Sequence, residues 1–283
     1  IFSFSVAGIE FALRWYAVSY LAGFFVAIII MKFFLGKESL WRFNVGPLDR
    51  DQVDSMMTYL ILGVIFGGRL GYVFFYNLDI YIENPLDALR VWDGGMAFHG
   101  GFLGVVIAAL LYCRSNGILV WSCADLIALS TGPGLLFGRI ANFVNAELWG
   151  RPTTAPWGVI FPGERAQDCP GVIEACARHP SQLYEAGLEG LLLFLVLIIS
   201  AYLGALRRPG VLTALFLIIY GGSRYFVEFF RVPDSQFFSA ENLNGFAYSF
   251  GEFGVTMGQC LSLPMIGFGI LLIITKYKKP RVG

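Results

Sequence analysis

Hydrophobic residues along this chain gather into long apolar runs separated by more polar connections. A membrane-crossing helix needs about 20 predominantly apolar residues, and a window of that length finds several such runs. They predict seven spans, at 17–35, 56–77, 96–113, 124–145, 184–204, 211–230 and 257–275. The pattern therefore predicts an all-α fold, a polytopic integral membrane protein with about seven transmembrane helices.

Glycine and proline interrupt the fourth and the second of these spans. Gly132-Pro133-Gly134 interrupts the fourth span, and Gly67-Gly68 interrupts the second. Such positions predict either broken helices that line a cavity or simple kinks. No long linker divides the chain, so we expect a single transmembrane domain over 1–283, with external loops near 148–183 and 231–256.

Composition agrees with a membrane protein. Of the 283 residues, 57% are hydrophobic and only 14% are charged, whereas a soluble domain has roughly 25% charged residues. The net charge is zero, so no overall basic field favours nucleic acid as a partner. The first apolar run is too long for the core of a signal peptide, and we expect it to be retained as a span.

Lysine and arginine are distributed unequally between the two sets of connections. Eleven cations lie in connections that would share one face, and six lie on the opposite face. The face richer in these residues is the cytoplasmic one by the positive-inside rule. We therefore expect an external N-terminus and a cytoplasmic C-terminus, whose basic tail includes Lys276, Lys278 and Lys279.

Polar residues within the spans are concentrated at one depth. In this orientation they fall in the outer half of the spans, whereas the cytoplasmic half is almost purely apolar. This polar set comprises Tyr16, Arg69, His99, Arg139, Asn142, Asn145, Tyr220, Arg224 and Glu228. The asymmetry favours one polar cavity that faces outward.

Arg139 is a costly residue at its position, within the motif GRIANFVNAELWG at 138–150. A charged group at membrane depth costs on the order of several kcal/mol unless it is paired or hydrated, so such residues usually mark a pathway or a site. Glu147 is two turns away, and Asn142 and Asn145 add polar groups beyond the needs of one ion pair. Guanidinium is well suited to bind phosphate. A lipid phosphate is the anion expected at this depth.

Other members of the set leave structural alternatives open. Arg224 and Glu228 are four residues apart and could neutralise each other on one helix face. Arg69 could be a third phosphate ligand or could extend to the external headgroups, and we favour a structural role. Tyr16 is most simply an interfacial aromatic anchor, whereas Tyr220, one turn before Arg224, lies deeper.

His99 is the candidate base in this set. Its imidazole, with an ordinary pKa near 6.5, can accept a proton at neutral pH. The glycines after it, Gly100, Gly101 and Gly104, instead favour close helix packing with a histidine at the interface. The second histidine, His179, lies in an external loop. No His and Cys cluster has the spacing of a metal site, so we expect no metal.

The five cysteines supply no candidate nucleophile. None is flanked by a histidine or a basic cluster in the same span, so a reacting thiol is expected to belong to the substrate. Cys169 and Cys176 share one external loop and could form a disulfide in an oxidising compartment.

Four segments resemble a known family. The 138–150 motif, RVWDGGM at 90–96 leading into His99-Gly100-Gly101, HPSQLYE at 179–185 and VEFFR at 227–231 are similar to those of bacterial phosphatidylglycerol:prolipoprotein diacylglyceryl transferases. The resemblance covers nearly the whole chain. It departs at Phe102, where we expect leucine, and in the cysteine-bearing stretch at 164–178.

The resemblance implies a reaction, a location and a site. Members of the family move the diacylglyceryl group of phosphatidylglycerol to the lipobox cysteine in the signal peptide of a preprolipoprotein, in the bacterial inner membrane. A thioether forms and glycerol phosphate leaves.

The resemblance also implies roles for individual residues. Arg139 and Arg224 hold the phosphate, and His99 is the base, unless the arginines alone lower the thiol pKa enough. No cofactor is implied, and the other partners are membrane lipids. The residues that would bind or orient the substrates are Tyr16, Arg69, Asn142, Asn145, Glu147, Gly150, Tyr220 and Glu228.

Two other classes of protein fit the sequence less well. A lipid-phosphate transporter or flippase would bind the phosphate without breaking a bond, but it would favour a polar path to the cytoplasm and paired broken helices from an internal repeat. A phospholipase or headgroup phosphotransferase would need a metal-binding cluster or an internal nucleophile. The sequence shows none of these features.

Overall fold

The structure is a computed structural model of the whole chain. It describes residues 2–6, 9–13, 15–76, 78–90, 95–169, 175–233, 237, 242, 244–250 and 253–277. The chain forms two compact units, one made of Ile1–Ala27 and Ala128–Gly283 and the other of Ile28–Ile127. The single domain expected over 1–283 stays a prediction.

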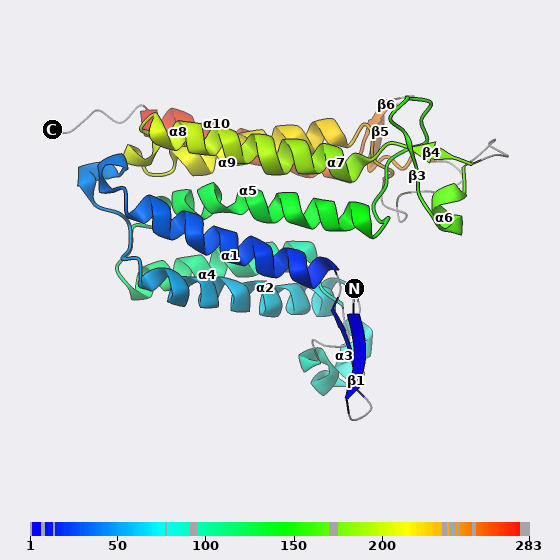
Figure 1. Cartoon of the computed structure of the whole chain (residues 1–283), viewed down its shortest axis with the longest axis horizontal. Coiled ribbons are helices and arrows are strands. Elements are labelled where there is room, and N and C mark those ends of the chain that lie inside the picture. The colour runs from blue at the N-terminus through cyan, green and yellow to red at the C-terminus, as the bar shows by residue number, and fades with distance from the viewer. Residues whose placement is uncertain are drawn as a thin grey trace. The chain divides into compact units, whose positions relative to one another are not determined.

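Seven apolar helical segments dominate the described residues (Figure 1). Five are long and apolar enough to cross a membrane, and two are shorter. The long segments are α1 (Trp15–Leu35), α2 (Gln52–Tyr76), α5 (Val120–Val144), the run from α7 through α8 (Ser181–Tyr202) and α10 (Met257–Tyr277). The shorter ones are α4 (Phe98–Ser115) and α9 (Val211–Val227). Each coincides with a predicted span to within a few residues, so the predicted helices are confirmed.

The unit formed by 28–127 is held together by close packing of α2 against α4. A Cβ added to Gly67 would lie 2.8 Å from the Cα of Gly104, and one added to Gly71 would lie 2.7 Å from the Cα of Gly100. Only residues without side chains let two helix backbones approach this closely. The glycines after His99 therefore pack α4 against α2, which is the close helix packing that the sequence offered as an alternative to a catalytic role for this segment.

The interior glycines and proline do not break their helices. Both α2 and α5 are continuous, and Pro133 lies inside α5. A Cβ added to Gly190 would lie 2.8 Å from the Cα of Leu136 in α5. This close approach brings the segment around Gly190 against α5, which positions the charged residues described below.

The run from Ser181 to Tyr202 changes helix type along its length. It begins as α7 (Ser181–Glu185), continues as the π-helix η5 (Ala186–Leu192) and ends as α8 (Leu193–Tyr202). The wider turn of a π-helix is often found at functional sites. Figure 1 shows α8, α9 and α10 running alongside one another, and they form the helical body of the unit that contains 128–283.

Short elements join the long helices. Three antiparallel strand pairs lie in the described residues, and the sequence did not predict them: β1 (Phe2–Val6) with β2 (Ile9–Leu13), β3 (Val159–Ile160) with β4 (Ala177–Arg178), and β5 (Tyr248–Phe250) with β6 (Phe253–Val255). The short helices among the described residues are η1 (Glu38–Leu40), η2 (Arg42–Asn44), α3 (Leu78–Glu83), η3 (Pro85–Leu89), α6 (Glu164–Gln167) and η6 (Ala205–Arg207).

The expected loop at 148–183 is folded around a buried arginine. The Arg178 guanidinium donates to the carbonyls of Ala166 at 2.5 Å and Asp168 at 2.8 Å, and it stacks over the Trp149 ring at 4.2 Å. Burial lowers the pKa of Arg178 from its ordinary value. Cys169 and Cys176 are joined by a disulfide in this loop, which answers the question that their spacing left open.

Candidate active site

Among the described residues, three arginines and three glutamates form one charged cluster, hereafter the Arg–Glu cluster. All six lie in the unit that contains 128–283. Arg139 comes from α5, Glu185 from α7, Glu189 from η5, Arg224 from α9, and Glu228 and Arg231 from the turn after α9. Charges buried among apolar helices are tolerated when they are paired. Each member of the cluster is paired.

Glu185 is the centre of the Arg–Glu cluster. Its side chain is fully buried, and its carboxylate oxygens lie 3.2 Å from Arg139, 3.2 Å from Arg224 and 2.5 Å from Arg231. One carboxylate thus holds three guanidinium groups that would otherwise repel one another. The Arg139 and Arg224 side chains keep 20% of their surface exposed, so they can reach a ligand while their partner cannot.

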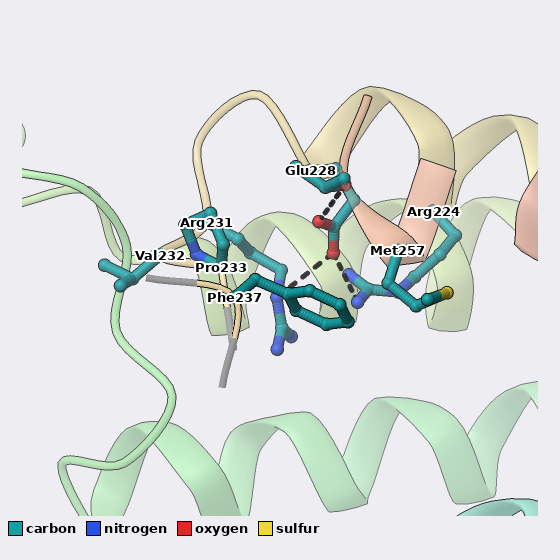
Figure 2. Close-up of a pocket in the computed structure, with 9 residues that line it drawn as sticks. Arg224, Glu228, Arg231, Val232, Pro233, Phe237 and Met257 are labelled. Carbon is teal, nitrogen blue, oxygen red and sulfur yellow. Dashed lines mark hydrogen bonds and ion pairs between the residues drawn. The ribbon is translucent and has the colours of Figure 1, made fainter. Parts of the chain in front are cut away.

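Glu228 is the second carboxylate that holds more than one arginine. It forms an ion pair with Arg224, lies 3.5 Å from Nε of Arg231 and accepts a hydrogen bond from Thr256 Oγ1 at 2.7 Å. Figure 2 shows Glu228 pointing between these two arginines, at the edge of a small pocket that Phe237 also lines. The ion pair between Arg224 and Glu228 that the sequence allowed is therefore present, within a larger network.

Glu189 is bound more weakly. Its side chain is fully buried, but within the described residues its ion pair is with Arg139 alone, at 3.5 Å. Neither of its carboxylate oxygens accepts a hydrogen bond. Tyr220, one turn before Arg224 and stacked on Phe216, lies within electrostatic range of Glu189 and Arg139.

A second polar group lies where α5 ends. Tyr16 Oη donates to Glu147 Oε2 at 2.9 Å, and Asn142 Nδ2 donates to Tyr16 Oη. Gln182 Nε2, which is buried, donates to the Glu147 carbonyl at 2.5 Å. Tyr16 is thus tied to the 138–150 motif rather than only anchored at an interface. Asn145 lies in the turn after α5, where its backbone N–H donates to the Ala141 carbonyl at 2.9 Å.

Gly150 joins the 138–150 motif to two other segments. Its N–H donates to the His179 carbonyl at 2.9 Å, and it forms an antiparallel bridge with Arg231. A Cβ at this position would lie 2.7 Å from the His179 oxygen, so only glycine fits without a shift. Arg151 adds a hydrogen bond from Nε to the Arg231 carbonyl at 2.8 Å. These contacts set the position of Arg231 in the Arg–Glu cluster.

His99 and Arg69 lie in the other unit, 28–127. His99 is exposed near the start of α4. Arg69 is buried, and its guanidinium donates to the carbonyls of Asp87 at 2.6 Å and Ala88 at 2.9 Å. These bonds fix η3 to α2 and favour the structural role over phosphate binding for Arg69. Residues 91–94 of the RVWDGGM segment and the tail 278–283 lie outside the described residues.

No group of three or more His, Cys, Asp or Glu side chains is arranged to hold a metal ion among the residues that the structure describes. The ordered polar groups of the site are instead guanidiniums, carboxylates, amides and a phenol. This set of donors and acceptors suits recognition of an anionic phosphate and its hydroxyl-bearing substituents.

Comparison with known proteins decides the family. A family model described as prolipoprotein diacylglyceryl transferase matches residues 3–275. The chain belongs to this family. It is 54% identical to the phosphatidylglycerol--prolipoprotein diacylglyceryl transferase of Ruegeria pomeroyi over 97% of this chain and 93% of that protein. The enzyme of the same name from Rhizobium leguminosarum bv. trifolii is 46% identical over 92% of this chain and 86% of its own length.

Membership of the prolipoprotein diacylglyceryl transferase family confirms the resemblance, the polytopic membrane fold and the predicted enzyme class, a diacylglyceryl transferase. The roles of individual site residues stay predictions. Three members of the Arg–Glu cluster were not predicted as site residues, namely Glu185, Glu189 and Arg231, although Glu185 and Arg231 lie in the HPSQLYE and VEFFR motifs. The rule that identified Arg139, a charge within an apolar span, applies equally to Glu189 and would have found it.

Proposed function

We propose that this chain transfers the diacylglyceryl group of phosphatidylglycerol to the lipobox cysteine thiol of a preprolipoprotein. A C–S bond forms at the glycerol carbon, the C–O bond to phosphate breaks, and glycerol phosphate leaves with the electron pair. Family membership supports this reaction, and the single structural observation that carries it is the group of three arginines held by Glu185 among apolar helices.

In this proposal Arg139 and Arg224 bind the lipid phosphate. The phosphate gains negative charge as it leaves, and preorganised cations stabilise such charge strongly in a water-poor site. Both guanidiniums share Glu185 as a partner and keep part of their surface exposed. Glu185 and Glu228 hold the two forks in fixed orientations, which suits bidentate contacts with phosphate oxygens.

The group formed by Tyr16, Asn142 and Glu147 is proposed to orient the glycerol headgroup. Glu147 is an exposed carboxylate with one oxygen occupied by Tyr16, so its other oxygen can accept hydroxyl protons from the lipid. Tyr220 and Gly150 shape the site, the first beside Arg139 and the second by fixing Arg231. Asn145 is proposed to contribute a polar side chain at the end of α5.

His99 is proposed as the base that deprotonates the thiol. A free thiol has a pKa of about 8.5 and is mostly protonated at neutral pH, so a base placed beside it accelerates attack. His99 is exposed at the start of its helix and can therefore exchange protons.

We propose the bacterial inner membrane as the location of the protein, with the N-terminus outside and the site in the outer half of the bilayer. The signal peptide of a preprolipoprotein presents its cysteine at this depth, and the lipid diffuses in the same leaflet. The external loops near 148–183 and 231–256 are suited to contact the peptide because loops carried on a rigid scaffold commonly supply recognition.

The deciding experiment is a transfer assay with the purified chain. The protein is incubated with phosphatidylglycerol and a lipobox peptide, and the peptide is analysed by mass spectrometry. We expect a diacylglyceryl adduct on cysteine, and no adduct on a matched peptide with serine in its place. Absence of the adduct in several detergents would exclude the proposed reaction. Binding of the lipid without any adduct would instead favour a transporter or flippase.

A further inference from the structure

The Arg–Glu cluster is balanced in charge when all of its members are ionised. Within the described residues it contains three arginines and three glutamates in mutual contact. A site with no net positive charge offers little long-range attraction to an anion. Binding of a singly charged phosphodiester would therefore be favoured if one carboxylate gave up its charge.

The three carboxylates are not equivalent partners of the arginines. Glu185 contacts three guanidiniums, and Glu228 contacts two and accepts a hydrogen bond from Thr256. Within the described residues Glu189 forms an ion pair with Arg139 alone, at 3.5 Å, and neither of its oxygens accepts a hydrogen bond, whereas Glu185 lacks one only at Oε2, the oxygen that faces Arg139. Its side chain is fully buried. An ionised carboxylate in such a place lacks the hydrogen bonds that normally compensate burial.

The Glu189 carboxylate lies against Arg139, a proposed phosphate ligand. Gly190 lets η5 approach α5 at Leu136, which places Glu189 against Arg139. The other charged or titratable groups that face Glu189 are Glu185 on α7, Tyr220 and Arg224 on α9, and Arg231 after α9. Arg139 is therefore shared between Glu185, which has other partners, and Glu189, which has none within the described residues.

We propose that Glu189 is an exchangeable ligand of Arg139. The phosphate of an anionic phosphodiester lipid replaces the Glu189 carboxylate on the guanidinium, and Glu189 takes up one proton as it is released. The proton neutralises a buried carboxylate that would otherwise face the bound phosphate. This role rests on the proposed function, because it assumes that Arg139 binds the phosphate of the lipid substrate.

Proton uptake on binding has a measurable consequence. By linkage, the affinity for the lipid falls as pH rises wherever Glu189 is ionised in the free protein, by about tenfold per pH unit. Glu189→Gln cannot ionise and leaves Arg139 free for phosphate. We therefore expect this variant to bind the lipid at least as tightly as the wild type does at low pH, with little dependence on pH.

The test uses the full chain in detergent micelles that contain phosphatidylglycerol, with phosphatidylethanolamine micelles as the baseline. Lipid affinity is measured from about pH 6 to about pH 9 for the wild type, Glu189→Gln and Glu189→Asp. The aspartate variant keeps a titratable group and should keep the pH dependence. Glu164→Gln, on the exposed short helix α6, is the matched control and should behave as the wild type.

An equal pH dependence in the wild type and Glu189→Gln would overturn the proposal. Proton uptake can also be measured without any variant, by a pH indicator in weakly buffered solution, and absence of uptake on lipid binding would overturn it as well. A parallel transfer assay with the wild type separates the two hypotheses. No adduct there counts against the proposed reaction, whereas the role of Glu189 is judged from the binding data alone.

Discussion

Glu185 on α7 holds Arg139 of α5 through an ion pair of 3.2 Å, with the carboxylate fully buried and the guanidinium partly exposed. The same carboxylate holds Arg224 and Arg231. The arginines are therefore positioned by a partner that solvent does not reach. This relationship separates the residue that orients the guanidinium from the surface that binds the ligand, and the two can be tested independently.

Arg139→Lys is expected to lower kcat/KM by about 100-fold, although the charge is retained. Lysine offers a point charge, whereas the planar guanidinium can contact a phosphate through two donors while it stays paired with Glu185. The measurement is the initial rate of peptide modification at varied lipid concentration. Arg165→Lys, in the exposed helix α6, is the matched control and should keep wild-type activity. Near-normal turnover of Arg139→Lys would reduce Arg139 to a structural role.

Glu185→Gln is expected to lower the free energy of unfolding by roughly 3 kcal/mol, because loss of one partner from a buried ion-pair network leaves charges uncompensated. The three arginines would lose their shared carboxylate and repel one another. Thermal unfolding in detergent, followed by tryptophan fluorescence, measures the change.

Glu164→Gln serves as the control for that substitution, since the Glu164 side chain is exposed. It should unfold as the wild type does. If Glu185→Gln unfolds at the wild-type temperature, the arginines are held by something other than this carboxylate.

The sequence predicted the helices well because their signal is local. A run of about 20 apolar residues specifies a span without any knowledge of its neighbours. The short strand pairs were not predicted, because strands of two to five residues are too short to show a periodic pattern. The same contrast holds in the site: ion pairs within one helix can be predicted from spacing, whereas ion pairs between helices depend on tertiary packing.

The partners of Arg139 depend on tertiary packing. The nearest acid along the chain, Glu147, accepts a hydrogen bond from Tyr16 instead. The carboxylates that pair with Arg139 are Glu185 and Glu189, which come from a separate helical segment that Gly190 brings against α5. Spacing along one helix can predict a pair such as Arg224 with Glu228, but it cannot predict a pair between helices.

His99→Gln tests the proposed base through the pH dependence of activity. At about pH 7 the variant is expected to react about 100-fold more slowly than the wild type, because general base catalysis commonly contributes this much. The deficit should shrink as pH approaches about 8.5, where the thiol ionises unaided. Initial rates over this range give the result. An equal deficit at every pH would indicate that His99 acts through helix packing.

His179 makes stability depend on pH in a predictable direction. Burial lowers the pKa of its imidazole from the ordinary value of 6.5, and Nδ1 lies 3.0 Å from Tyr184 Oη. The unfolded chain therefore binds more protons than the folded one as pH falls through this value, so the free energy of unfolding decreases on acidification. The contribution of His179 to the free energy of unfolding is fully retained above about pH 7.5.

The measurement for His179 is the difference in unfolding temperature between about pH 7.5 and about pH 5.5. The unfolding temperature of the wild type should fall more on acidification than that of His179→Asn, in which the titrating group is absent. Equal losses in the two proteins would show that other groups account for the pH dependence.

Gly150→Ala is expected to disrupt the site through the backbone. The added Cβ would lie 2.7 Å from the His179 oxygen and 2.8 Å from the His179 Cβ, so the bridge to Arg231 must shift. A shift of this kind moves Arg231 relative to Glu185, and small misplacements of site residues can cost about 100-fold in rate.

The matched control is Gly267→Ala in α10. Its added Cβ meets nothing within 4 Å, so this variant should be active and at least as stable as the wild type. The assay is transfer to the lipobox peptide, with unfolding temperature measured in parallel. Full activity of Gly150→Ala would mean that the strand bridge does not control the Arg–Glu cluster.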